Sequence, residues 1–177
     1  MPPRRNGYHR LQTRTLQVMA DAEASADGPW SLGACGQPLA LEVLAGGRRL
    51  ITGSGWSPDV AGPQALRLVD AGSTASVGDQ PCGEPLAGFA ASVLGPRMRG
   101  AGEVLDARRQ EAPGAIWLEL AHDGWAQRFG LRHERRLYLD AAADELRGED
   151  RLTPLQARGD GDRRRFVPFA VRFHLHP

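Results

Sequence analysis

The sequence predicts an all-β domain, an antiparallel β-sandwich, and three observations support that fold class. Apolar residues recur at every second position and not at every third or fourth, which is the period of a strand. The 22 glycines and 13 prolines interrupt the chain at short intervals, as turns between short strands require. Gly46 and Gly47 separate two such alternating runs, a pattern typical of a tight β-hairpin.

Several runs qualify as strands because each alternates apolar and polar residues between turn residues. In chain order they are 16–20, 39–44, 48–53, 73–77, 115–122, 132–140, 144–152 and 169–176. Only residues 97–110 and 140–147 could form helix on propensity, and neither has an apolar stripe or capping residues. Residues 158–165, RGDGDRRR, are expected to form an exposed loop.

The apolar faces of these runs predict the core of the sandwich. The residues expected to be buried are Leu39, Leu41, Ile116, Leu118, Leu137, Leu139, Val171 and Phe173. The last run ends at Pro177, and nothing after it could cover its edge, which a complete sheet normally avoids. We therefore expect a sandwich that is truncated at its C-terminus.

The composition fits one ordinary globular domain. The chain has 177 residues, of which 41% are hydrophobic and 24% charged, and it contains no apolar run long enough to cross a bilayer. All 22 basic residues are arginine, but 21 acidic residues offset them and leave a net charge of +1. This balance argues against a nucleic-acid partner.

The N-terminal segment and the two cysteines bear on compartment and redox state. The basic start, MPPRRNGYHR, is not followed by an apolar segment, so no signal peptide is visible, which suggests either a cytoplasmic protein or a missing N-terminal part. Cys35 and Cys82 could pair, but two cysteines do not make a disulfide framework.

Three histidines are candidates for chemistry. His174 and His176 stand two apart on one strand face, where they could reach one zinc ion, but no third ligand is identifiable by spacing. A solvent-facing pair is the simpler interpretation, so we expect neither a metal nor another cofactor. His122 is the third candidate, and it precedes Asp123 and Gly124, whose pairing favours a hairpin turn.

Trp125 could offer a flat apolar face to a sugar ring, although a tryptophan beside a strand end is more often part of the core. Arg128 and Arg172 are the arginines that we expect to assist it, because a guanidinium suits carboxylate and sulfate groups. On the strand 132–140, His133 and Arg135 share the face of the leucines. We expect them to bond across to a carboxylate such as Glu145 or Glu149.

Several segments, in order, resemble the C-terminal region of bacterial heparinase II/III-like proteins. They are GYHRLQTRTLQVMADA at 7–22, LALEVLAGGRRLITGSG at 39–55, HDGWAQRFGLRHERRLYLDAAADELRGEDRL at 122–152 and FAVRFHLHP at 169–177. The resemblance runs, with gaps, over nearly the whole chain and identifies residues 1–177 as part of a β-sandwich domain.

The resemblance implies a polysaccharide lyase in which an N-terminal helical toroid, absent from these residues, packs on the sandwich. Such a lyase cleaves an acidic, uronic acid-containing glycan by β-elimination, with its tyrosine acid/base on the toroid. The resemblance also implies a location in the periplasm or cell envelope.

The family's sandwich contributes one histidine and, in some members, a structural zinc. The corresponding positions here are 34–37, near Gly53 and near Gly72, and none of them is His or Asp. Two hypotheses therefore stand. The chain is either the sandwich of a lyase, inactive alone, or a non-catalytic glycan-binding or structural module of the envelope.

Overall fold

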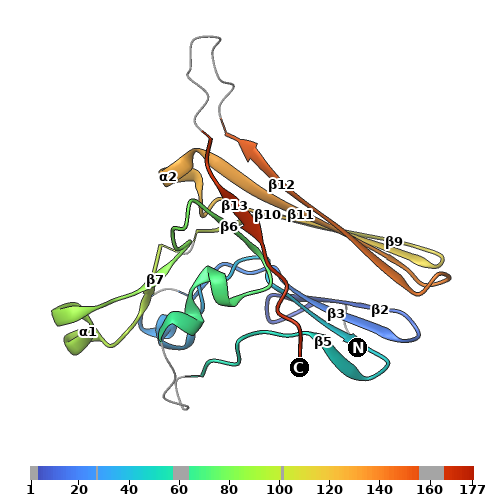
Figure 1. Ribbon diagram of the computed structural model, residues 1–177, viewed down its shortest axis with the longest axis horizontal. Coiled ribbons are helices and arrows are strands. Elements are labelled where there is room, and N and C mark those ends of the chain that lie inside the picture. Colours follow the sequence, from blue (N-terminus) through green and yellow to red (C-terminus); the bar gives the residue numbers. More distant parts are fainter. Residues whose placement is uncertain (1–3, 27, 58–63, 101, 156–165) are drawn as a thin grey trace, which may run out of the picture.

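The computed structural model describes residues 4–26, 28–57, 64–100, 102–155 and 166–177. Two antiparallel sheets lie face to face, which confirms the predicted β-sandwich (Figure 1). The loop predicted at 158–165 lies outside the described residues. Among the described residues, no helix has the length and apolar character needed to cross a bilayer.

The first sheet has five strands in sequential order. They are β1 (Arg4–Arg5), β2 (Tyr8–Gln12), β3 (Leu16–Asp21), β4 (Leu41–Ala45) and β5 (Arg48–Ile51). Gly46 and Gly47 both have positive φ, 58° and 78°, which the tight turn between β4 and β5 requires and which only glycine adopts without strain. The predicted hairpin is thereby confirmed, whereas β1 and β2 were not predicted.

The second sheet has four strands, also paired with their neighbours in the chain. They are β9 (Val104–Ala112), β10 (Ala115–His122), β11 (Leu131–Asp140) and β12 (Glu145–Pro154). The stretches 97–110 and 140–147, which have helical propensity, form parts of strands and turns here, because pairing with β10 and β11 satisfies their backbone.

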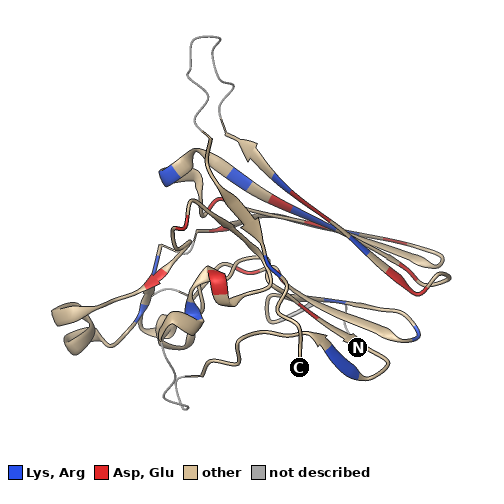
Figure 2. Cartoon of the chain, in the orientation of Figure 1, with Lys and Arg blue, Asp and Glu red and all other residues tan. Residues whose placement is uncertain are grey.

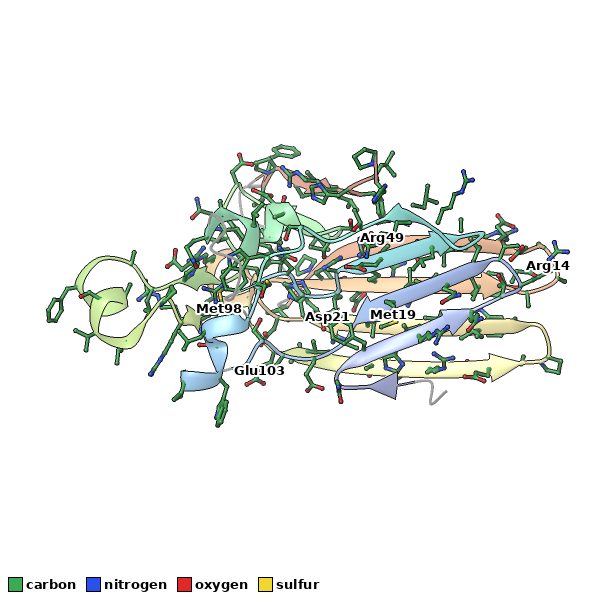
Figure 3. The ribbon with its side chains drawn as sticks, turned by 90° about the horizontal axis from the view of Figure 1, so that it is seen from below. Arg14, Met19, Asp21, Arg49, Met98 and Glu103 are labelled. Atoms are coloured by element: carbon green, nitrogen blue, oxygen red, sulfur yellow. The ribbon has the colours of Figure 1, made fainter. Side chains whose placement is uncertain are left out.

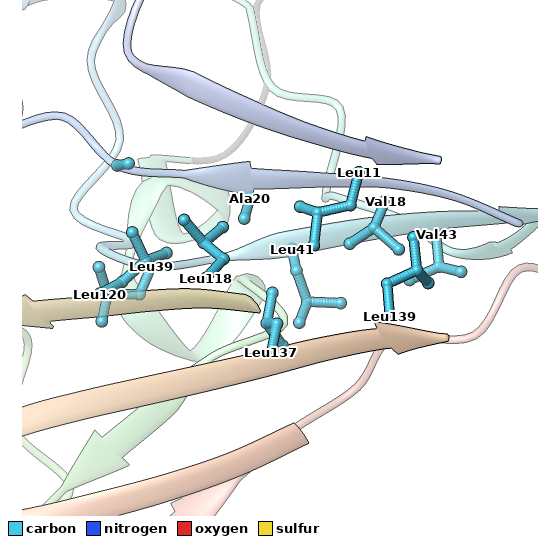
Figure 4. Packing of buried hydrophobic residues seen from close by; sticks show 11 residues of the cluster. Leu11, Val18, Ala20, Leu39, Leu41, Val43, Leu118, Leu120, Leu137 and Leu139 are labelled. Atoms are coloured by element: carbon cyan, nitrogen blue, oxygen red, sulfur yellow. The ribbon is translucent and has the colours of Figure 1, made fainter. Parts of the chain in front are cut away.

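The main core fills the space between the two sheets (Figure 4). Of the residues predicted to be buried, Leu39, Leu41, Leu118, Leu137 and Leu139 are buried there. Ile116 packs against the same cluster and is partly buried. The alternating pattern thus identified the centre of the core correctly.

The C-terminal segment departs from its prediction as one long strand. Only β13 (Phe169–Val171) is a strand, and it pairs with β6 (Ala75–Val77). The chain then crosses to the edge of β5, where Leu175 bridges Ile51. Because it changes partner, its alternating side chains no longer face one core. Val171 is therefore only partly buried, and the prediction that Phe173 is buried was wrong, since 50% of it is exposed.

The connections carry the remaining short elements. They are η1 (Gly28–Gly33), η2 (Gln64–Arg67), η3 (Val69–Ala71), β7 (Glu84–Pro85), α1 (Gly88–Leu94), β8 (Met98–Arg99) and α2 (Ala126–Phe129). The helix α1 lies at the end of the β7–β8 excursion, away from both sheets (Figure 1). None of its residues is buried, and its apolar side chains Phe89, Val93 and Leu94 are exposed.

Candidate functional site

His122, one of the three histidine candidates for chemistry, belongs to a buried chain of hydrogen bonds. The Gly124 N–H donates to His122 Nδ1 over 3.1 Å, so the ring proton of neutral His122 is on Nε2. That proton is donated to His133 Nδ1 over 3.0 Å. His133 in turn donates from Nε2 to Asp150 Oδ1 over 2.7 Å. The chain runs in one direction and ends on a carboxylate.

Arg135 holds the other side of Asp150. Its Nε and Nη2 donate to the two carboxylate oxygens over 2.8 and 3.0 Å, a bidentate pair. Its Nη1 donates to the backbone carbonyls of Leu39 and Ser73, both over 2.8 Å. Arg135 therefore ties the second sheet to loops beside the first. The predicted carboxylate partner was Glu145 or Glu149, and this was wrong.

These contacts fix the charge of the network. Burial alone would raise the pKa of Asp150, but the hydrogen bonds from His133 and Arg135 lower it to about 2. Burial, and then the proximity of His133 and Arg135, holds the pKa of His122 well below its usual 6.5. His122 is fully buried and neutral, so it supports the fold and cannot reach a polymer at the surface.

The hypothesis that Trp125 stacks on a sugar is wrong, because the side chain is fully buried. It packs in a second core cluster with Val69, Val77 and Cys82. The expected two-residue turn at Asp123 and Gly124 is also absent from the described chain. The connection from β10 to β11 is longer and contains α2. Trp125 is the N-cap residue of this helix, and its side chain is buried.

The other candidate residues do not form one site. Arg128 donates to the Pro81 carbonyl over 2.8 Å beside a cavity of about 610 Å³. Arg172 pairs with Asp70 over 2.6 Å, and His174 donates from Nε2 to the Asp70 backbone carbonyl over 3.0 Å. His176 is exposed at the chain's end. Arg172 and His174 thus meet at Asp70, while Arg128 and His176 lie elsewhere.

A different pocket, of about 410 Å³, opens on the outer face of the first sheet, and we call it the Asp21 pocket. Strand pairing sets Tyr8 opposite Asp21, and Met19 opposite Glu42, with all four side chains pointing away from the core. Figure 3 shows Asp21 and Met19 along β3. Loop residues that include Trp56 complete the lining.

Burial shapes the acid–base behaviour of the Asp21 pocket. Burial raises the pKa of Asp21 to about 6, although the hydrogen bond from the Glu23 backbone N–H lowers it, and the charge of Glu23 adds a smaller rise. Burial, followed by the proximity of Asp21, also raises the pKa of Tyr8. Burial is also the main reason that the pKa of the Cys35 thiol is raised. Asp21 can therefore exchange a proton near neutral pH, and the pocket becomes more negative above pH 6.

The loops around the Asp21 pocket are held by buried polar contacts. Gln37 donates from Nε2 to the carbonyls of Leu66 and Leu68 over 2.8 and 3.0 Å. The guanidinium of Arg67, which is fully buried, lies 4.4 Å from the ring centroid of Trp56. This cation–π contact fixes the tryptophan in the wall of the pocket.

The positions that the resemblance assigns to the family's histidines and aspartate meet at this same pocket. Cys35, Gln37, Gly53 and Gly72 all line it. The Gly53 N–H donates to Glu42 Oε1 over 3.1 Å, and a Cβ on Gly72 would lie 3.0 Å from Cβ of Gln37. These residues do not fit a zinc site. Within the described residues, no three His, Cys, Asp or Glu side chains cluster closely enough to hold a metal ion.

Asp21, Glu42 and Trp56 were not among the site residues predicted from the sequence. Alternation along β3 puts Met19 and Asp21 on the face away from the buried Val18 and Ala20, and the sequence alone indicates this much. It does not say that Glu42 pairs across from Met19, nor that Trp56 comes over the same face from a loop.

The antiparallel sandwich fits the class of protein that the sequence resemblance indicates. The family model described as "Heparinase II/III-like, C-terminal" matches residues 4–177, and the chain belongs to that family. A curated relative is the FtsZ-localized protein C of Caulobacter vibrioides (strain NA1000 / CB15N), which is 48% identical over 174 residues. The match covers 97% of this chain but 30% of that relative, so the chain spans less than a third of the relative's length.

Proposed function

We propose that this chain is a non-catalytic β-sandwich module of a heparinase II/III-like protein. The observation that carries the proposal is the charge of the Asp21 pocket. At the place where the family resemblance expects histidines, the pocket has the carboxylates of Asp21 and Glu42, and its described lining includes no Arg or His. The buried histidine chain supports the same conclusion, because His122 and His133 are both committed to the fold.

The chemistry of elimination explains why this charge matters. A lyase lowers its barrier by neutralising the carboxylate of the uronic acid and by placing an acid and a base at the reacting carbons. Asp21, with a pKa of about 6, is mostly ionised at neutral pH and would repel that carboxylate, as would Glu42. An acidic polysaccharide is therefore a poor ligand for the Asp21 pocket.

An ultraviolet assay tests the absence of catalysis, because elimination leaves an unsaturated product that absorbs. The chain is incubated with heparin, heparan sulfate and alginate, and no product is expected. A variant with Asp21→Asn and Glu42→Gln, which removes the repulsion, is also expected to be inactive. Product that disappears when His174 or His176 is changed to Ala would overturn the proposal and place an active site on the sandwich.

The name of the relative supports a more specific part of the proposal. We extend its property to this chain and infer a module of a protein that localises with FtsZ, at or near the cell envelope. The 48% identity over 174 residues makes an exchange of the two domains practical.

In the exchange experiment, this chain replaces the matching region of the fluorescently tagged relative in Caulobacter vibrioides. Fluorescence microscopy is expected to find the chimera with FtsZ. Cell fractionation of the same strain tests the envelope location. A control chimera that carries Asp150→Ala, which destabilises the sandwich by about 3–5 kcal/mol, is expected to give a weaker signal. A folded chimera that no longer localises with FtsZ would contradict this part of the proposal.

Family membership favours a second candidate function, the sandwich of an active lyase whose acid and base lie outside this chain. The helical toroid of the family would then be its partner and an acidic polysaccharide its substrate. Assaying the purified chimera on the same polymers separates the two candidates. Unsaturated product from the chimera, with none from the isolated chain, would favour the lyase.

A further inference from the structure

The outer face of the second sheet carries an aromatic row that none of the preceding functions uses. Strand register aligns four side chains across the sheet, one from each strand. In order from β9 to β12 they are Gln110, Trp117, Tyr138 and Arg147. Since Leu118 on β10 points into the core, its neighbour Trp117 points to solvent, and 40% of Trp117 is exposed.

The row is held in place before any ligand arrives. The rings of Trp117 and Tyr138 have centroids 5.0 Å apart and are tilted by 42°. Arg147 lies over the other ring, 5.9 Å from the Tyr138 centroid. Glu145 accepts from Nε and Nη2 of Arg147 over 3.0 and 2.8 Å. Tyr138 is thus covered and supported, and Trp117 is the ring left open, so little side-chain entropy is lost when a ligand stacks there.

A small hollow of about 160 Å³ lies beside the open ring of Trp117. Its other lining residues are Arg108, Gln110 and Glu119. At about 30 Å³ for each water of liquid volume, the hollow is large enough for roughly five waters, which is the scale of one sugar ring. A guanidinium, an amide and a carboxylate around one aromatic face supply both donors and acceptors for hydroxyl groups.

The charges of this face select against an ionic ligand. The neighbouring row across the sheet alternates Arg108, Glu119, Arg136 and Glu149. Arg136 pairs with Glu119 over 3.3 Å and with Glu149 over 3.7 Å. Figure 2 shows blue and red segments close together on this sheet. Arginines that are balanced by carboxylates give no field to attract a phosphate, sulfate or uronate polymer.

We propose that the face around Trp117 binds an uncharged pyranose glycan, with one sugar ring stacked on the indole and its hydroxyls bonded by Arg108, Gln110 and Glu119. We call it the Trp117 face. The proposal goes beyond the function above and does not depend on it, because the Trp117 face and the Asp21 pocket lie on the outer faces of different sheets.

Isothermal titration calorimetry with chitohexaose and cellohexaose, two uncharged probes, tests the Trp117 face. Binding is expected for at least one of them and not for heparin. Trp117→Ala is expected to weaken it by at least about tenfold, and Trp117→Phe to restore most of the affinity, because a ring face remains. Glu119→Ala is expected to weaken it by a smaller factor.

The matched control is Trp30→Ala, which removes an indole that is 85% exposed on η1, outside both sheets. It is expected to leave the affinity unchanged, and thermal melting checks that every variant is folded. Equal affinity in wild type and in Trp117→Ala would overturn the proposal. So would stronger binding to heparin than to both uncharged probes, or no binding to either probe. Iodide quenching of indole fluorescence in the chimera, without glycan, is a second test. If Trp117→Ala does not change the quenching, Trp117 is already shielded from iodide. The rest of the protein would then cover this face, and the proposal would be overturned.

Discussion

Arg135 and Arg136 are neighbours in the chain with the same chemistry, yet they lie on opposite faces of β11. One links buried parts of the fold, and the other forms ion pairs at the surface. Arg135 is 1% exposed, and it joins Asp150 to the loops beside the first sheet. The Arg136 side chain is 50% exposed, and its ion pairs lie in solvent. The comparison teaches that strand parity, and not residue type, decides which polar groups hold the sandwich together and which are left for a ligand.

The largest effect is expected at the centre of the inner face, in the variant Asp150→Ala. It leaves Arg135 buried without its carboxylate and His133 without its acceptor. Breaking a buried pair in this way typically costs about 3–5 kcal/mol, so urea denaturation is expected to find a loss of unfolding free energy of that size. A loss below about 1 kcal/mol would mean that water satisfies Arg135 and His133 in place of Asp150. The inner face would then be no more dependent on its ion pair than the outer face is.

Leu118→Ala tests the apolar part of the same face. The side chain is fully buried between the sheets, and its removal leaves a cavity. Such substitutions cost about 2–5 kcal/mol of unfolding free energy, which a urea titration measures. Glu119→Ala, one residue away on the outer face, is the control and is expected to change it by less than about 0.5 kcal/mol. Similar losses for the two variants would show that the register is wrong.

Asp21→Asn sharpens the comparison, because Asp21 lies on an outer face but is largely covered. Its pKa is raised from 3.8 to about 6. The stability that it contributes is therefore full below about pH 4 and is lost as the pH rises through 6. The variant is expected to be more stable than wild type by about 1–2 kcal/mol at pH 8 and to lose that advantage at pH 4. Unfolding midpoints at the two pH values measure this, and an advantage that does not depend on pH would contradict it.

The smallest effect is expected for Arg136→Ala. Its two ion pairs are half exposed, and surface pairs contribute about 0–1 kcal/mol. We expect thermal melts in low salt to differ from wild type by less than about 0.5 kcal/mol, and the difference to vanish in high salt. A loss comparable with that of Asp150→Ala would show that the outer row is structural.

The predictability of the molecule follows the same division between faces. Alternation of apolar residues was enough to place Leu118 and Leu137 in the core, because a pattern of period two is local. It could not choose Asp150 over Glu149 as the partner of the inner face, since that choice depends on the register of β12 against β11.

For a related reason, the sequence did not decide which tryptophan is buried and which is exposed. Trp125 was a candidate sugar platform with burial in the core as the simpler interpretation, and it lies in the second core cluster. Trp117 lies inside a predicted strand and was not among the candidate residues. Because its neighbour Leu118 points into the core, Trp117 points to the outer face of β10. The Asp21 pocket was missed because Glu42 and Trp56 come to Asp21 only through pairing and loop packing.

The order of strands along the chain has a consequence for synthesis on the ribosome. The first sheet is complete at Ile51, but the leucines that cover its apolar face lie on β10 and β11, which ends at Asp140. At about 5–20 residues per second, the roughly 90 intervening residues take about 5–18 s to appear. During that interval Leu11, Val18 and Val43 have no second layer, and the nascent chain presents an apolar surface that a chaperone could recognise.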